Sequence, residues 1–166
     1  IGNLKQQKFS YPPAVESLCE RIERDFLRIG RTAKPRVLCE MLEIKDELWR
    51  DAVEGYLNTQ RFYLLVEPED FDIALGTYEK MRREKKVYGV GLINVGKLEE
   101  YDTAPEGSLA TAVEADNIYA KRYVNMILGK VHMCTRVDDL KKYAVSITPQ
   151  CMRYQNHVAS AIKPEI

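Results

Sequence analysis

The stretch that most constrains the fold is residues 42–78, where a helical pattern, an apolar run and a second helical pattern follow one another closely. In residues 47–57, which carry the only tryptophan, the apolar side chains recur at helical spacing. Residues 61–67 are almost continuously apolar, which favours a short strand covered on both faces. Residues 68–86 begin with proline and acids and end in bases, as a helix does. The order predicts a mixed α/β domain of the α+β type.

The rest of the chain continues this alternation of elements. Four apolar runs predict further strands near the end of the chain, at 131–135, 145–148, 152–154 and 158–162. We also expect helices at 14–29, 47–57, 108–114, 117–128 and 137–143, a strand at 87–94, and either a strand or a helical turn at 36–44. Asp46, Ser108 and Asn117 are the expected N-caps.

The domain organisation follows from these elements. Residues 1–34 are expected to form an N-terminal helical unit, and 35–166 a domain of two small mixed-sheet subdomains, at about 35–105 and 106–166. The apolar stripe of the first helix fits a remnant of a coiled-coil arm and, equally, a helix packed on its own domain.

Charge excludes an attraction of the whole domain to nucleic acid, because 25 basic residues balance 25 acidic ones. Local basic groups are the remaining ligand signal, since clustered lysines and arginines neutralise phosphates. The candidate DNA contacts are Arg82, Arg83, Lys85, Lys86, Lys121, Arg122, Lys141 and Lys142. Solvated helix ends would explain the same residues.

No motif of catalysis or cofactor binding is found. GxxxxGK[ST] is absent, and the GVG at 89–91 lacks the third glycine of a dinucleotide loop. His132 and His157 have no metal-site context, and the four cysteines form no CxxC pair. We therefore expect no enzyme, no cofactor and no metal site in this chain.

The location of the chain is inferred from what it lacks. The apolar runs are far too short for a membrane span, and no signal-peptide pattern precedes them. The unpaired cysteines favour a reducing cytoplasm. Since the first residue is Ile1, we expect an excised fragment of a longer protein and not a secreted product.

Several phrases together resemble the hinge domain of SMC-type chromosome-organising ATPases, over roughly residues 35–162. The phrases are WRDAVEGYL at 49–57, LLV at 64–66, AL at 74–75, GLIN at 91–94 with KL at 97–98, YVNMILGKV at 123–131, VDDL at 137–140 and VSITPQCM at 145–152. The resemblance implies an SMC-hinge-like fold and a homodimer that joins two coiled-coil arms, with weak, non-specific contact to double-stranded DNA.

Within that superfamily, AVEGYLNTQRF at 52–62 and LLVEPEDF at 64–71 are most similar to the JetC subunit of Wadjet anti-plasmid systems, which are relatives of the condensin-like protein MukB. This implies that the full-length protein is an ATPase located at the nucleoid in the cytoplasm. Its implied partners are a kleisin-type subunit and a nuclease subunit, and the nuclease would cleave small circular DNA.

A hinge needs a surface for its second copy, and we expect that surface at the turn after the 117–128 helix and the strand that follows. The candidate interface residues are Leu128, Gly129, Lys130, Val131, His132 and Ile147. The sequence departs from the family at two glycine positions associated with dimer contact. Asn58 and Thr59 replace one glycine pair, and Gln150 or Cys151 replaces the glycine of the last turn.

Two other interpretations stay open from the residues alone. The chain could be a monomeric α/β module that binds nucleic acid or another ligand through its basic groups, in which case binding would depend strongly on salt. It could also be an enzyme of a type without a visible motif, in which case a deep pocket with shifted titratable groups is expected.

Overall fold

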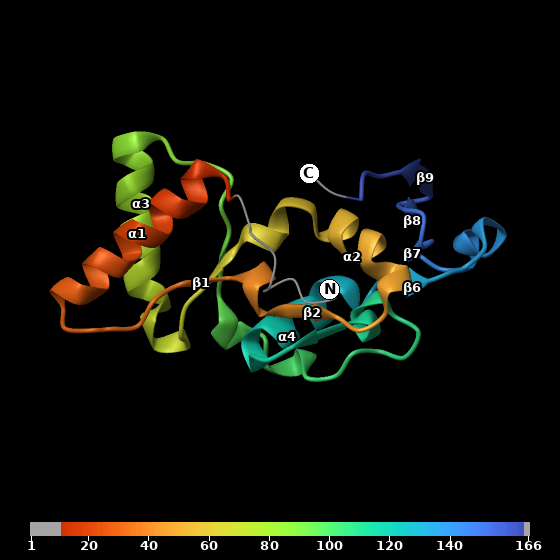
Figure 1. The fold of residues 1–166 in the computed structure, drawn as a ribbon, viewed down its shortest axis with the longest axis horizontal. Coiled ribbons are helices and arrows are strands. Elements are labelled where there is room, and N and C mark those ends of the chain that lie inside the picture. The colour runs from red at the N-terminus through yellow and green to blue at the C-terminus, as the bar shows by residue number, and fades with distance from the viewer. Residues whose placement is uncertain (1–10, 165–166) are drawn as a thin grey trace.

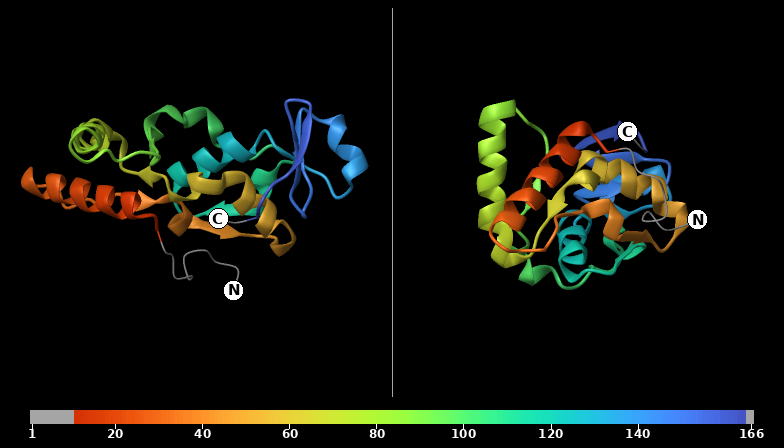
Figure 2. Two further views of the ribbon diagram at one scale, coloured as in Figure 1. Left: turned by 90° about the horizontal axis from the view of Figure 1, so that it is seen from above. Right: turned by 60° about the vertical axis from the view of Figure 1, so that its left-hand side comes forward.

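The computed structural model describes residues 11–164, which form an elongated body with three parts along its long axis (Figure 1). Two crossing helices lie at one end, a mixed helix-and-strand body in the middle, and a small sheet at the other end, as the left view of Figure 2 also shows. The helices are α1 (Pro13–Arg28), α2 (Arg50–Leu57), α3 (Phe71–Lys85) and α4 (Ile118–Leu128).

Nine short strands form three sheets in the described residues. The strands are β1 (Arg36–Val37), β2 (Leu42–Ile44), β3 (Leu64–Leu65), β4 (Leu92–Ile93), β5 (Val113–Ala115), β6 (His132–Met133), β7 (Val145–Ile147), β8 (Met152–Gln155) and β9 (Val158–Ala161). Strands β1, β3 and β4 form one sheet, with β1–β3 antiparallel and β3–β4 parallel. Strands β2 and β5 pair antiparallel. The order of the third sheet is β6-β7-β8-β9, in which only β6–β7 is parallel.

The two crossing helices enclose a small hydrophobic core of their own. Helix α1 buries Val15, Leu18, Ile22 and Phe26 of its predicted apolar stripe, and it packs against α3. Ile29, the last predicted position of the stripe, lies beyond the end of the helix and is exposed. Ala74 and Met81 of α3 face the same cluster. Burial of this stripe follows from the hydrophobic effect, which contributes about 1.5–3 kcal/mol for each large apolar side chain.

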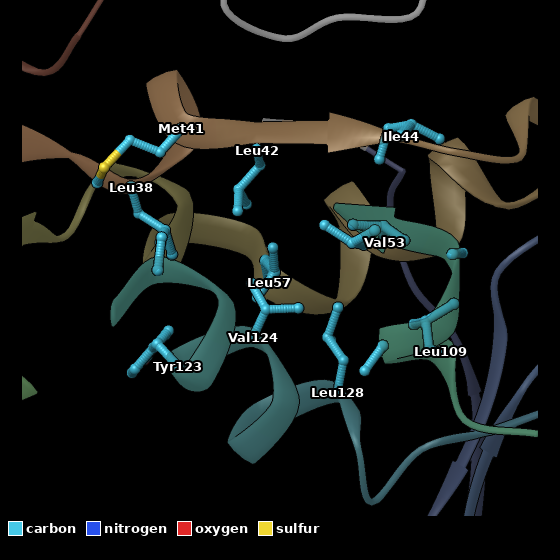
Figure 3. Close-up of a cluster of buried hydrophobic side chains, with 14 of the residues drawn as sticks. Leu38, Met41, Leu42, Ile44, Val53, Leu57, Leu109, Tyr123, Val124 and Leu128 are labelled. Carbon is cyan, nitrogen blue, oxygen red and sulfur yellow. The ribbon is translucent and has the colours of Figure 1, made fainter. Parts of the chain in front are cut away.

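The main core lies in the middle of the molecule, between α2, α4 and the β2–β5 pair. Figure 3 shows Leu42, Leu57 and Val124, which come from β2, α2 and α4, pointing toward one another. Its buried residues come from both sides of residue 105, and Ile147 of the far sheet also belongs to it. The subdomain boundary near residue 105 therefore stays a prediction, and residues 1–10 of the predicted N-terminal unit lie outside the described residues.

Strand β3 joins the two cores. Leu64 is buried in the α1–α3 core and Leu65 in the main core, because successive side chains of a strand point to opposite faces. The strand is only two residues long, so the predicted strand at 61–67 is mostly wrong in extent. Residues Asn58–Phe62 form 3₁₀ turns before it.

Two of the expected helices are 3₁₀ and not α-helical, and the one expected at 137–143 is the 3₁₀ helix Val137–Lys142. The expected helix at 108–114 is a 3₁₀ turn, Leu109–Ala112, which is followed by β5. Strand β5 pairs with β2, about seventy residues earlier in the sequence, and such a distant partner leaves no local signal. Asp46 and Asn117 cap their helices as predicted, whereas Ser108 makes no side-chain cap.

Candidate dimer and DNA interface

The predicted interface turn connects α4 to β6 through a glycine that the packing requires. Gly129 follows α4, and its N–H donates to the carbonyl of Asn125 over 2.9 Å. A Cβ at this position would lie 2.1 Å from the Asn125 oxygen and 3.0 Å from Cδ of Pro105. Since real Cβ atoms do not approach a backbone oxygen so closely, the turn accepts only glycine without rearrangement.

The six predicted interface residues fall into two groups. Leu128, Val131 and Ile147 are fully buried in the main core of the single chain. Gly129 and His132 are partly exposed, and Lys130 is exposed. In this conformation only the second group can touch a partner, and the contact itself stays a prediction.

A hollow of about 470 Å³ opens beside the turn. Gly129, Lys130 and His132 line it together with Lys142 and Tyr143. The His132 and Tyr143 rings stack, with their centroids 3.6 Å apart and their planes 8° apart. Tyr143 carries no signal in the sequence for this position, because only the parallel pairing of β6 with β7 brings the chain on either side of the 137–142 turn together.

The outer edge of β6 is not free for a partner strand. Segment 107–109 covers it, since Leu109 N–H donates to Val131 over 2.7 Å and Met133 N–H to Gly107 over 3.0 Å. A single bridge also joins Ser108 and His132.

The open edge of this sheet is β9, which pairs with β8 alone in the described part of the chain. Its sequence, VASA, contains no charged residue, and Val158 is 58% exposed. Protein edge strands normally carry charges, prolines or a cover that prevents pairing. An uncovered and uncharged edge is suited to pairing with another strand.

Several of the eight candidate DNA contacts already pair with groups of the same chain. Arg82 and Arg83 both meet Glu79, at 2.7 and 3.5 Å. Lys142 meets Asp139 at 2.9 Å. Such pairing reduces the charge that these groups present to a phosphate.

Two other candidate DNA contacts, Lys121 and Arg122 of α4, have structural roles. The ammonium of Lys121 donates to the carbonyls of Ala110 and Val113, at 3.1 and 2.7 Å, and burial lowers its pKa. Arg122 pairs with Asp102 at 2.6 Å and is only 17% exposed. The remaining candidates, Lys85, Lys86 and Lys141, are exposed.

The basic groups do not converge. Figure 1 places the end of α3 at one end of the long axis and the helical turn Val137–Lys142, drawn in blue, at the opposite end. The eight cations therefore do not form one patch.

The described residues show little sign of reactive chemistry. They contain no cluster of three or more histidine, cysteine or acidic side chains that could hold a metal. Cys39 is buried and Cys19 partly buried, and burial raises the pKa of each thiol to about 12. Among residues 11–164, no helix is long and apolar enough to cross a bilayer.

The chain is similar in structure to SMC hinge domains from two organisms. It matches the hinge domain of the Pyrococcus furiosus SMC protein with a TM-score of 0.63 and 16% identity, over 91% of this chain and 86% of the other. It matches the Geobacillus stearothermophilus SMC hinge domain, solved as an asymmetric dimer, with a TM-score of 0.67 and 13% identity, over 91% and 65%. The Pyrococcus furiosus hinge with an extended coiled coil gives 0.62 and 17%, over 87% and 56%.

These likenesses confirm the predicted fold class, a mixed α+β fold of the SMC-hinge type. No protein-family model matches the chain, and no curated protein does.

Proposed function

We propose that this chain is the homodimerisation hinge of an SMC-like ATPase that organises chromosomes or plasmids. The observation that carries the proposal is the structural likeness to the Pyrococcus furiosus SMC hinge over 91% of the chain. A hinge joins two ATPase subunits and needs no catalytic site of its own, which agrees with the absence of nucleotide motifs from the sequence.

The second copy has two separate surfaces to bind, at opposite edges of the β6–β9 sheet. One is the partly exposed Gly129–His132 turn with its hollow. The other is the edge of β9, whose backbone can add a strand from a partner. A lasting joint should bury at least about 1,200 Å² in total.

The test is the molar mass in solution, measured by light scattering during size-exclusion chromatography over a wide dilution range. We expect twice 19.2 kDa at every dilution. A mass of 19.2 kDa at all concentrations would overturn the proposal and favour the monomeric binding module.

A variant at the edge of β9 tests whether the second copy binds there. Asn156 and His157 both have positive φ, which makes the β8–β9 connection a two-residue hairpin turn. In such a hairpin Gln155 and Val158 form the hydrogen-bonded pair, so the N–H of Ala159 points outward. Ala159→Pro removes this donor and should weaken the dimer, whereas Ala159→Ser keeps it and should not. Unchanged tryptophan fluorescence would confirm that both variants stay folded.

The finer assignment is to a JetC-like subunit of a Wadjet-type system, and it is supported by the phrases at 52–62 and 64–71. It implies kleisin-type and nuclease partners in the full-length protein and a place at the nucleoid. Cells that carry the complete system should lose a small circular plasmid, and should keep it when the full-length protein lacks residues 35–166.

A weak DNA contact is the last part of the proposal. Lys85 and Lys86 at the end of α3, and Lys141 at the far end, are the exposed cations that support it. With few cations in any one place, the contact would be non-specific and sensitive to salt.

A further inference from the structure

Gly55 lies in the middle of α2, where a glycine normally weakens a helix by roughly 0.5–1 kcal/mol relative to alanine. It is buried, and the segment that follows β9 passes directly over it. In Figure 1 the chain turns back from β9 toward α2 before it ends.

The contact is between backbones, which explains the glycine. A Cβ on Gly55 would lie 2.5 Å from the carbonyl oxygen of Lys163 and 3.2 Å from Cα of Pro164. No side-chain rotation can relieve such a contact, because all of the nearest atoms are main-chain atoms. An alanine would have to displace the segment.

Neighbouring contacts hold the segment in this place. The N–H of Ile162 donates to the carbonyl of Cys151 over 3.0 Å, and its side chain packs against the main core. At the next residue of α2, the Tyr56 hydroxyl donates to Gln155 of β8 over 3.1 Å. Helix α2 and the β8–β9 hairpin thus form one seat for residues 162–164.

We infer that Gly55 is a positioning residue that seats residues 162–164 on α2 and thereby sets the path of the chain after β9. The functional consequence of this chain path rests on the proposed function as a hinge. In a hinge, a second arm that continues from this segment would leave beside the main core and not along the open edge of β9.

The test compares two helical glycines. Gly76 of α3 has no atom within 4 Å of its would-be Cβ, so Gly76→Ala should raise the Tm by about 2–4 °C through helix propensity alone. Gly55→Ala should lower the Tm instead. Gly55→Ala should also raise the hydrogen-exchange rate of the Ile162 amide by about tenfold or more, whereas Gly76→Ala should leave that rate unchanged.

A second pair of variants shows whether Gly55 is needed for its contact with residues 162–164 or for another reason. In a chain that stops after Ile162, Gly55→Ala should be tolerated and should raise the Tm as Gly76→Ala does. Equal destabilisation in the full and shortened chains, or failure of both to fold, would overturn the inference. A monomer with a protected Ile162 amide would overturn the hinge proposal and leave the role of Gly55 standing.

Discussion

At the scale of single residues, five residues other than glycine in the described part of the chain have a positive φ, and Asn58 and Cys151 are two of them. Asn58 has φ 51° with ψ −128°, and Cys151 has φ 73°. Asn58 belongs to the pair, and Cys151 is one of the two alternatives, at which the sequence departs from the glycines of the resembled pattern. The backbone at both residues has the positive φ that glycine adopts most readily.

The exposed position of Asn58 makes this strain measurable. Asn58→Gly should stabilise the protein by about 1 kcal/mol, because relief of roughly 1–3 kcal/mol of strain exceeds the added entropy of the unfolded chain. The midpoint of urea unfolding at constant slope gives the change. Cys151→Gly is the contrast, since it also removes a buried thiol and should not stabilise. A lower midpoint for Asn58→Gly would contradict the assignment of strain.

Tyr123 should make stability depend on alkaline pH. Burial raises the pKa of its hydroxyl from about 10 to about 12, and the hydroxyl donates to Gln60 over 2.6 Å. A pKa higher in the folded state means that the contribution is complete below pH 10 and is lost as the pH rises through 12.

The loss between pH 9 and pH 12 should be about 2–3 kcal/mol smaller in Tyr123→Phe than in the parent protein. Urea unfolding at a series of pH values measures it, and Tyr88→Phe, at an exposed site, is the control. Identical alkaline profiles for parent and Tyr123→Phe would refute this assignment.

At the scale of elements, the sequence predicted helices better than strands. The first four positions of the α1 stripe and the caps Asp46 and Asn117 depend on neighbours in the sequence, and each is found as expected. Leu48 is one of the apolar side chains at helical spacing in residues 47–57, but it is 56% exposed, because it lies in a 3₁₀ turn whose period differs from that of the α-helix. The predicted strand lengths were wrong because the length of a strand depends on its pairing partner, which can lie far away in the sequence.

The prediction of the candidate interface had the same limit. The sequence predicts the order helix, glycine and strand at Leu128–His132, but it does not predict which of these side chains are buried in the core. Leu128 and Val131 are apolar and lie beside a turn, which fits both a contact surface and a core. Only the packing of α4 under α2 distinguishes the two.

A buried ion pair joins two elements and should matter for stability. Asp70, at the start of α3, is 1% exposed and lies 2.6 Å from Nε of Arg31 in the loop after α1. Asp70→Asn leaves the Arg31 charge without its partner and should cost about 2–4 kcal/mol, somewhat less than a fully buried pair because Arg31 is 39% exposed.

The surface pair Lys45–Glu114 provides the control for this prediction. Its groups are 51% and 58% exposed, so Lys45→Gln should cost less than about 1 kcal/mol. Thermal unfolding of the two variants measures the difference. A cost for Asp70→Asn no greater than that for Lys45→Gln would show that the pair does not hold α3 in place.

At the scale of the whole molecule, the separation of the basic groups decides how DNA can be bound. Each neutralised phosphate contributes about −0.9 to the slope of log affinity against log salt. Eight converging cations would give a slope near −7, whereas Lys85 and Lys86 alone should give about −2. Fluorescence anisotropy with duplex DNA over a range of salt measures the slope, and a value near −7 would mean that the groups meet on one DNA.

Strand β3 has a consequence for how this sequence can change in evolution. A substitution at Leu64 is felt by the α1–α3 core and one at Leu65 by the main core, so each core can drift through its own leucine. An insertion or deletion of one residue would exchange the two faces and damage both cores together. Related chains should therefore vary freely in loop length elsewhere, but keep the same residue count across this dipeptide.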